Sequence, residues 1–260
     1  MFESKPVHEL SVDEIISLTF RLYVDNFGIF FTPYLIFSII SALLSLPILS
    51  HIQNITKITG PPEVVLPKLL NMLLTLMALV FITAIISWII GGVVNGVLIK
   101  SASDLIENGK TSLSESFKFV ISKLPSLLVA SLIVGILVML GFLLLVIPGI
   151  IISLMFYLVI PVIIIENKGA IESLTRSKEL VSHRWLKTFV LSLIIGLIIL
   201  ALTFIVNLIL TPLGIYSSLI GTIISSLIVP ISPISSAFYY YSMLAKEESR
   251  KIPPPPPPPF

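Results

Sequence analysis

Four long stretches of the chain contain no Asp, Glu, Lys or Arg. They run from residue 26 to 51, from 69 to 99, from 124 to 165 and from 188 to 245. Each can cross a hydrocarbon layer of roughly 30 Å, which takes about 20 helical residues, and the last two can cross it twice. The runs do not alternate as barrel strands would. The pattern therefore predicts an all-α polytopic membrane protein with six transmembrane helices.

Turn residues divide the two longest stretches. Pro148 and Gly149 lie between two apolar runs in the third stretch, and residues 211–214 form a similar boundary in the fourth. Spans joined by so few residues are antiparallel neighbours. The pattern predicts three helical hairpins, with a kink at Pro230 and Pro233 and spans at residues 28–49, 68–99, 126–146, 150–165, 187–210 and 215–245.

A short amphipathic helix is expected before each hairpin. Two begin with Ser followed three residues later by Glu, at Ser11 and Ser112, a spacing at which each side chain binds the other's free backbone amide. The third begins at Gly169, with Glu172 in the matching position. Apolar residues then recur at helical spacing, as in helices of the membrane interface. These helices are expected at residues 12–27, 112–123 and 170–184, which makes three copies of one unit.

Composition and charge agree with this reading. The mean hydropathy is +1.08 and only 12% of residues are charged, against about a quarter in soluble domains. Of the 16 Lys and Arg residues, all but Lys57 and Lys68 fall on the side of the N-terminus. By the positive-inside rule, both termini and the three amphipathic helices face the cytoplasm of a cell membrane. With a net charge of +2, we expect no nucleic-acid partner.

The sequence offers no recognisable catalytic chemistry. No acidic or basic side chain falls inside the expected spans, where proton-coupled transporters and intramembrane proteases keep such groups. The absence of cysteine removes disulfides, thiolate nucleophiles and thiolate metal sites. The three histidines, His8, His51 and His183, do not have the spacing of a metal site. We therefore expect no enzyme activity, no cofactor and no metal.

Small and amide residues inside the spans leave two interpretations open. Gly92 and Gly96 would let a neighbouring helix approach closely, and Gly91 next to Gly92 is a candidate bend. Asparagine amides need a partner in lipid, so they either hold helices together or line a pathway for a neutral or lipid-like solute. The asparagines concerned are Asn71, Asn95 and Asn207.

Two further features lie outside the spans. Residues 1–246 are expected to form one membrane domain, followed by a disordered tail from 247 to 260. The tail contains the seven prolines Pro253 to Pro259, an extended run that either docks on an aromatic groove of a protein partner or acts only as a stiff tail. Asn54-Ile-Thr56 is a glycosylation acceptor pattern on the expected outer side.

One block of the chain resembles a known family of membrane domains. Residues 143–185, and also residues 10–31, are similar to a family that includes the membrane portion of some bacterial glycerophosphodiester phosphodiesterases and many stand-alone archaeal and bacterial proteins. The matching positions are Pro148, Gly149, Pro161, Glu166, Ala170, Glu172, Arg176, Ser177 and Trp185. In those fusions the phosphodiesterase activity belongs to a separate soluble domain. The resemblance therefore implies a membrane module without that activity.

The charged residues of this block are expected to form a structural joint. Glu172 precedes Arg176 by four residues, where an ion pair supports a helix. Together with Glu166 and Trp185, they are expected to position the fifth span on the fourth. The function expected is a non-enzymatic accessory or scaffold module that contacts membrane lipids or a partner protein at its cytoplasmic face. The alternative is a transporter or channel for a neutral or lipid-like solute.

Overall fold

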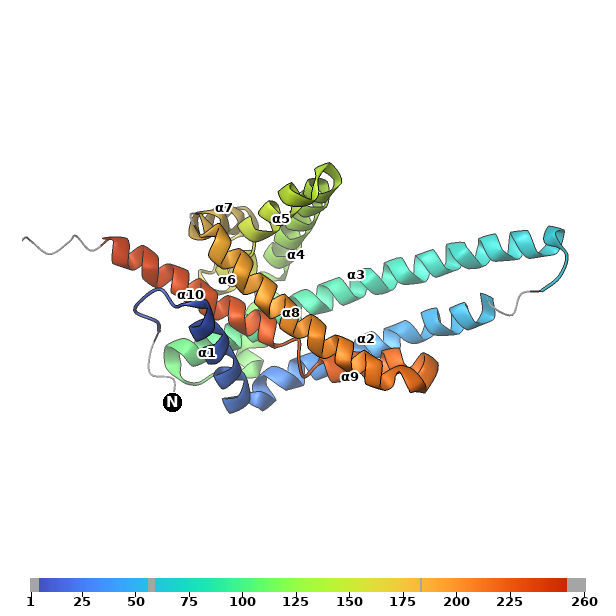
Figure 1. The fold of residues 1–260 in the computed structure, drawn as a ribbon, viewed down its shortest axis with the longest axis horizontal. Coiled ribbons are helices and arrows are strands. Elements are labelled where there is room, and N and C mark those ends of the chain that lie inside the picture. The colour runs from blue at the N-terminus through green and yellow to red at the C-terminus, as the bar shows by residue number, and fades with distance from the viewer. Residues whose placement is uncertain (1–4, 56–58, 183, 252–260) are drawn as a thin grey trace, which may run out of the picture.

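The computed structural model describes residues 5–55, 59–182 and 184–251, which form helices and no strand. This confirms the all-α class for these residues. Thr56, Lys57, His183 and the prolines Pro253 to Pro259 lie outside them. In chain order (Figure 1) the elements are α1 (Val12–Asp25), α2 (Phe27–Ile55), α3 (Pro62–Asn108), α4 (Leu113–Leu144), α5 (Val146–Met155), α6 (Val159–Ile165), α7 (Ala170–Val181), α8 (Trp185–Leu210), the 3-10 helix η1 (Thr211–Tyr216), α9 (Ser217–Ser225) and α10 (Ile231–Lys251).

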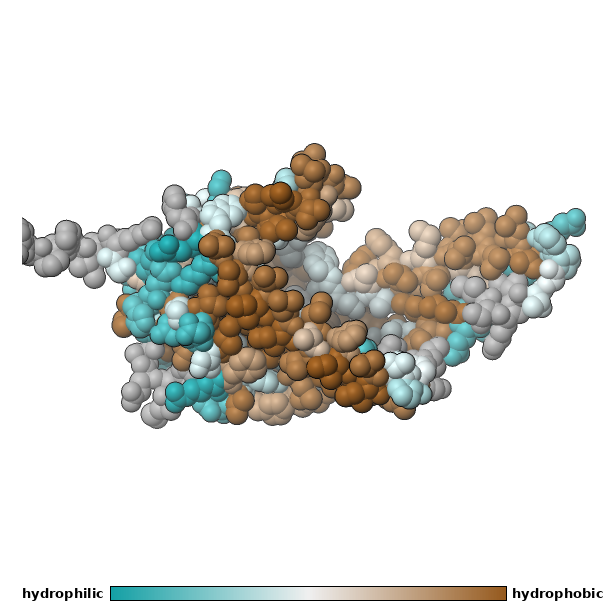
Figure 2. All heavy atoms as spheres, in the orientation of Figure 1, coloured by the Kyte–Doolittle hydropathy of each residue, from teal (hydrophilic) through white to brown (hydrophobic). Residues whose placement is uncertain are grey.

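Among the described residues, five helical segments are long and apolar enough to cross a membrane. They are Phe27–Asn54, Pro62–Asn108, Leu113–Leu144, Val146–Ile165 and Trp185–Gly214. Large apolar side chains are exposed along them. Hydrophilic residues gather instead at the end of the molecule where α1 and the C-terminal part of α10 lie (Figures 1 and 2). This distribution is that of a helical membrane protein, and we call the hydrophilic region the polar end.

The chain turns back on itself after α2, α4 and α8 (Figure 1). Accordingly, α2 packs against α3, α4 against α5, and α8 against α9. α3 is 47 residues long, about 70 Å, and extends beyond the predicted 68–99 at both ends. It is one helix through Gly91 and Gly92, and its last turns are buried in the polar end. Gly109 ends it with left-handed backbone angles, for which glycine is favoured.

The turn between α4 and α5 is not at the predicted residues. It lies at Leu145, which has extended backbone angles of φ −164° and ψ 157°. Pro148 and Gly149 belong to the first turns of α5, so the predicted Pro148-Gly149 turn is wrong. Proline is tolerated at this position because the first amides of a helix have no intrahelical acceptor.

Gly149 serves close packing instead. A Cβ built on Gly149 would lie 2.5 Å from the Phe142 ring, and one built on Gly141 would lie 2.9 Å from the Cα of Gly149. Both distances are shorter than real contacts. The backbones of α4 and α5 therefore approach each other through two glycines, as small residues allow in membrane helices.

Two of the three predicted amphipathic helices are separate elements. α1 has the Ser11–Glu14 capping box, with both of its reciprocal bonds. It ends at Asn26, whose side chain binds the Leu22 carbonyl. The buried face of α1 packs on α10. α7 begins after Gly169 and is also a short helix.

The middle amphipathic helix does not exist as a separate element. Residues 113–123 belong to α4, which continues through Pro125 to Leu144, so the predicted separate helix at 112–123 is wrong. After residue 123 the chain has no residue that ends the helix as Asn26 ends α1. Membrane helices tolerate proline in this way because neighbouring groups satisfy the carbonyl that it frees.

The region predicted as the sixth span, residues 215–245, is broken. α9 ends at Ser225, residues 226–230 form turns, and α10 starts at Ile231, directly after Pro230. Proline has no amide hydrogen for the ladder, so a break at this position is expected. α10 continues to Lys251. The tail predicted to begin at residue 247 is therefore helical up to that point.

α10 forms the centre of the polar end. It packs against α1, α3, α6, α7 and α8. The three adjacent tyrosines Tyr239, Tyr240 and Tyr241 are buried, as are Ile234 and Phe238. Burial of aromatic side chains dominates core energetics. The buried core thus surrounds α10, while the apolar hairpins extend away from it (Figure 1).

The glycine contact between α4 and α5 gives a direct test. We expect Gly141→Ala to lower the unfolding free energy in detergent by about 1–3 kcal/mol, because the new methyl group meets the backbone of α5. Gly135→Ala on the same helix meets nothing within 4 Å and is expected to raise stability by about 0.5–1 kcal/mol. Thermal unfolding of the purified variants measures both. Equal melting temperatures for the two variants would contradict the close approach.

Candidate functional site: the charged clusters around α10

Each of the three adjacent tyrosines of α10 bonds to a different part of the structure. The Tyr239 hydroxyl lies 2.6 Å from Thr188 Oγ1 on α8. The Tyr240 hydroxyl donates to Glu166 Oε1, at 3.0 Å, directly after α6. The Tyr241 hydroxyl lies 2.7 Å from Ser103 Oγ and donates to Glu107 Oε1, both on α3. Successive helical residues point about 100° apart, so one helix reaches three neighbours.

Arg176 is the centre of a first charged group, which we call the Arg176 cluster: Glu166, Lys168, Arg176, Glu179, Tyr240 and Glu247. Arg176 Nε donates to Glu166 Oε1 at 2.9 Å, and a terminal nitrogen of Arg176 lies 2.6 Å from Glu247 Oε2. Lys168 Nζ lies 2.7 Å from the second oxygen of Glu166. The side chains of Arg176 and Glu166 are each only 16% exposed. The cluster joins α6, α7 and α10.

These contacts change the proton affinities of both partners. Burial raises the pKa of Glu166, but hydrogen bonds from Lys168, Arg176 and Tyr240 outweigh it, so the pKa lies below its usual value. Burial lowers the pKa of Arg176, but the bonds to Glu247 and Glu166 outweigh it and raise the pKa. The pair is therefore ionised at neutral pH.

Glu9 is the centre of a second charged group, the Glu9 cluster: Glu9, Arg184, Lys187 and Lys246. Its carboxylate lies 3.0 Å from a terminal nitrogen of Arg184, 2.7 Å from Lys187 Nζ and 3.1 Å from Lys246 Nζ. Next to it, the Leu10 amide donates to Ser242 Oγ at 2.9 Å, and Lys187 Nζ donates to the Leu10 carbonyl. The N-terminal segment is thereby fixed to α8 and α10.

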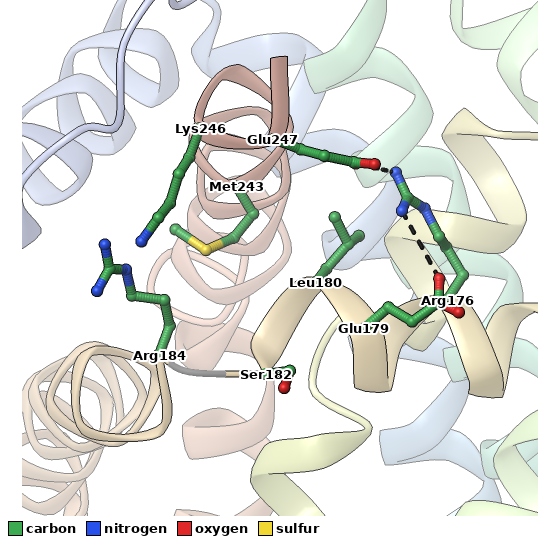
Figure 3. A pocket seen from close by; sticks show the side chains of 8 residues that line it. All are labelled: Arg176, Glu179, Leu180, Ser182, Arg184, Met243, Lys246 and Glu247. Atoms are coloured by element: carbon green, nitrogen blue, oxygen red, sulfur yellow. Dashed lines mark hydrogen bonds and ion pairs between the residues drawn. The ribbon is translucent and has the colours of Figure 1, made fainter. Parts of the chain in front are cut away.

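A cavity of about 300 Å³ lies between the two clusters. In Figure 3, Arg184 and Lys246 lie on one side, Arg176 and Glu247 lie on the other, and Met243 and Leu180 are between them. Arg184 and Lys246 make one side of the cavity cationic, whereas on the other side Arg176 is paired with Glu179 and Glu247. The side of Arg184 and Lys246 can hold an anionic group.

The family to which the chain belongs follows from a comparison with family models. The model described as Domain of unknown function (DUF7847) matches residues 58–240. The chain belongs to the DUF7847 family. No curated protein and no solved structure matches it. The DUF7847 match covers α3 to Tyr240, so it includes Arg176 and Arg184 but not Glu9 or Lys246.

In this DUF7847 protein Arg176 joins α6, α7 and α10, whereas the expected joint was between the fourth and fifth spans. Arg176 binds Glu166, Glu179 and Glu247 rather than Glu172, so the predicted Glu172–Arg176 ion pair is wrong. Glu172 is exposed in the first turn of α7. The closest contacts of the arginine are with Glu166 and Glu247, which are partly buried and lie outside α7. Trp185, half-buried, is the first residue of α8.

Ser177 supports the break between α5 and α6. The Ser177 hydroxyl donates to the Met155 carbonyl at 3.0 Å and accepts the Leu158 amide at 3.2 Å. It satisfies two backbone groups where the helix is interrupted, and burial makes such bonds necessary. Pro161 is buried in α6. The sequence contained no signal for this role of Ser177.

The two glycines predicted to allow close helix approach differ. A Cβ built on Gly96 would lie 2.8 Å from Val120 Cγ1 of α4, so Gly96 lets α3 and α4 meet. A Cβ on Gly92 would meet nothing within 4 Å. Gly92 lines a crevice of about 330 Å³ together with Tyr34, Phe37, Ser87, Trp88, Gly91, Asn95, Leu127, Leu128, Ser131 and Ile160.

Removing Arg176 should damage the fold. We expect Arg176→Ala to lower the unfolding free energy by about 2–4 kcal/mol, somewhat less than the about 3–5 kcal/mol for a fully buried pair, because two carboxylates lose their partner. Lys178→Ala on the same helix, where the side chain is exposed, is expected to change it by less than about 0.5 kcal/mol. Thermal unfolding in detergent measures the difference. A fully stable Arg176→Ala protein would refute the role of the cluster.

Proposed function

We propose that the chain is a non-enzymatic multi-pass protein of the cell membrane that acts as an accessory or scaffold module. Its polar end would contact lipid headgroups or a partner protein from the cytoplasmic side. One observation carries the proposal: both charged clusters lie at one end of the molecule, and exposed apolar helices extend from that end (Figure 2). The resemblance to the membrane portion of the phosphodiesterases stays a prediction, and it agrees with such an accessory role.

The path of the chain supports an even number of crossings. Lys246 Nζ lies 3.1 Å from Glu9 Oε2, so both ends of the described chain meet at the polar end. Five crossings would separate them. We infer that η1, α9 and the first half of α10 supply the return as a sixth, broken crossing.

The break in this crossing is well satisfied. The amides of residues 226–229 donate to carbonyls of residues 223–225 at the end of α9, three or four residues earlier. The Leu227 carbonyl accepts the Tyr23 hydroxyl at 2.9 Å. Non-helical backbone at membrane depth is tolerated where it is covered by protein in this way. α1 therefore belongs to the membrane domain as a covering element.

Cysteine labelling tests the topology, because the chain contains no cysteine. We expect His8→Cys and Ser249→Cys, both at exposed positions, to react with a membrane-impermeant maleimide from the cytoplasmic side only. Glu63→Cys at the opposite tip is expected to react only from the outer side. Sealed vesicles of both orientations provide the measurement. Labelling of the first two positions from opposite sides would refute the even number of crossings.

The exposed face of α7 is the surface most accessible to a partner. Its exposed residues are Ile171, Glu172, Thr175, Lys178 and Glu179. We expect a photo-crosslinking residue at position 175 to give a discrete protein or lipid adduct in cells, and the same residue at position 63 to give none. Versions ending at residue 251 show whether the proline tail is required. If neither position forms an adduct, the scaffold proposal loses its support.

A specific observation favours the transport alternative. The crevice beside Gly92 lies between α2, α3, α4 and α6, and it presents Ser87, Asn95 and Ser131 among aromatic and aliphatic side chains. A neutral or lipid-like solute would suit such a lining. Transport of a fluorescent lipid across vesicles containing the protein, abolished by Gly92→Leu, would favour this alternative over the scaffold.

A further inference from the structure

A groove runs between the start of α1 and the start of α8. We call it the α1–α8 groove; it has a volume of about 400 Å³ and is lined by Glu9, Val12, Arg184, Leu186, Lys187 and Val190. Arg184 also lines the cavity between the two charged clusters. The groove therefore connects the cationic part of the polar end with the first apolar turns of α8.

Positive charge is in excess at the end of the groove where Arg184 and Lys187 lie. Three cations, Arg184, Lys187 and Lys246, share the single carboxylate of Glu9. The side chains of Lys187 and Lys246 are only 17% and 12% exposed. Partly buried charges are screened less by salt than exposed ones. A second anion at this position would be strongly favoured.

Unused hydrogen-bond donors accompany this excess. Arg184 Nε is buried and has no acceptor. Lys246 Nζ is near Glu9 as an ion pair, but it is buried without a bond of hydrogen-bonding geometry. Buried donors without acceptors are rare because each costs about 1–3 kcal/mol. No acceptor for them is found among the described residues, and Arg184 lines both the groove and the cavity that Lys246 lines, so an anion beside Arg184 would lie near both donors.

The nearby carboxylates are already engaged. Glu247 and Glu179 line the adjacent cavity, but both face Arg176, at 2.6 Å and 3.8 Å. In addition, α8 is 26 residues long and has no side-chain cap at its first turn. The amide groups and dipole of a helix start favour an anion. The excess of cations, the donors of Arg184 and Lys246 and the start of α8 therefore all favour an anionic ligand.

An apolar stripe continues from the groove along α8. Leu186 is 75% exposed, and the exposed Leu193 and Leu197 follow on the same helical face, with Val190 between them. From Leu186 to Leu197 the helix rises about 16 Å. One leaflet of a hydrocarbon layer of roughly 30 Å has about the same depth.

We propose that the α1–α8 groove binds an anionic phospholipid. The phosphate lies between Arg184 and Lys187, and one acyl chain lies along Leu186, Val190 and Leu193. The phosphate shares the cations Arg184 and Lys187 with Glu9. Basic pockets of this kind at membrane boundaries recognise anionic headgroups. The inference rests on the proposed placement of the polar end at the membrane face.

Lipid binding to the detergent-purified full chain tests the proposal by native mass spectrometry. We expect phosphatidylglycerol to bind at least about tenfold more tightly than phosphatidylcholine, and Arg184→Gln with Lys187→Gln to remove this preference. The matched control is Lys118→Gln, an exposed cation on α4, which should leave it unchanged. Equal binding of the two lipids, or equal loss in the control, would overturn the proposal.

A second variant avoids the charged contacts that the fold uses. Leu186→Glu places a carboxylate at the mouth of the groove and should weaken phosphatidylglycerol binding about tenfold more than Leu186→Gln, which removes the same apolar contact without adding a charge. Competition by inorganic phosphate is a second measurement. Weak competition at millimolar concentration agrees with a lipid ligand, and complete competition at micromolar concentration would replace the lipid by a free phosphate ligand and refute the proposal.

The outcomes separate this site from the proposed function. If His8→Cys and Ser249→Cys label from the same side but the lipid preference is absent, the groove proposal fails and the topology stands. If the two positions label from opposite sides, the proposed function fails, whatever the lipids do. A lipid preference that depends on Arg184 and Lys187 in a protein with the expected topology supports both.

Discussion

The structure depends on the need to satisfy three adjacent buried hydroxyl groups. A buried hydroxyl without a partner costs about 1–3 kcal/mol. Tyr239, Tyr240 and Tyr241 point in different directions, so their acceptors have to come from different elements. α8, the end of α6 and α3 supply them. This requirement fixes the positions of three neighbours around α10, and the apolar hairpins extend from the arrangement that results.

The charged clusters add further contacts that fix the elements around α10. Tyr240 and Arg176 share one oxygen of Glu166, so a hydrogen bond from α10 and an ion pair from α7 hold the same carboxylate. Partly buried ion pairs contribute little net stability after desolvation, but a missing partner is costly. The clusters therefore select one arrangement of the helices more than they stabilise it. The Glu9 cluster does the same for the N-terminal segment.

Much of the architecture could be predicted from local patterns. The charge-free runs indicated apolar helices, and the Ser11–Glu14 spacing indicated the start of α1. The central position of α10 could not be predicted in this way, because the hydrogen-bond partners of its three tyrosines lie 51 to 138 residues away. Residues 215–245 are apolar on average, so the sequence of this region resembled that of a single span. Three adjacent tyrosines were the available signal, since their hydroxyls cannot all face lipid. Likewise, Arg176 pairs with Glu166 and Glu247 of other elements and not with Glu172, which precedes it by four residues on the same helix.

The contact of α1 with the broken sixth segment limits where external ligands can bind. Tyr23 covers the Leu227 carbonyl, and the apolar face of α1 packs on α10. That face is therefore used inside the protein, and it is not available to lie on lipid as the amphipathic pattern suggested. At the polar end, the exposed surfaces include the outer face of α7 and the α1–α8 groove. The first is mostly charged and suits a protein or headgroup surface. The second combines cations with an apolar stripe, which only an amphiphile can satisfy throughout its length.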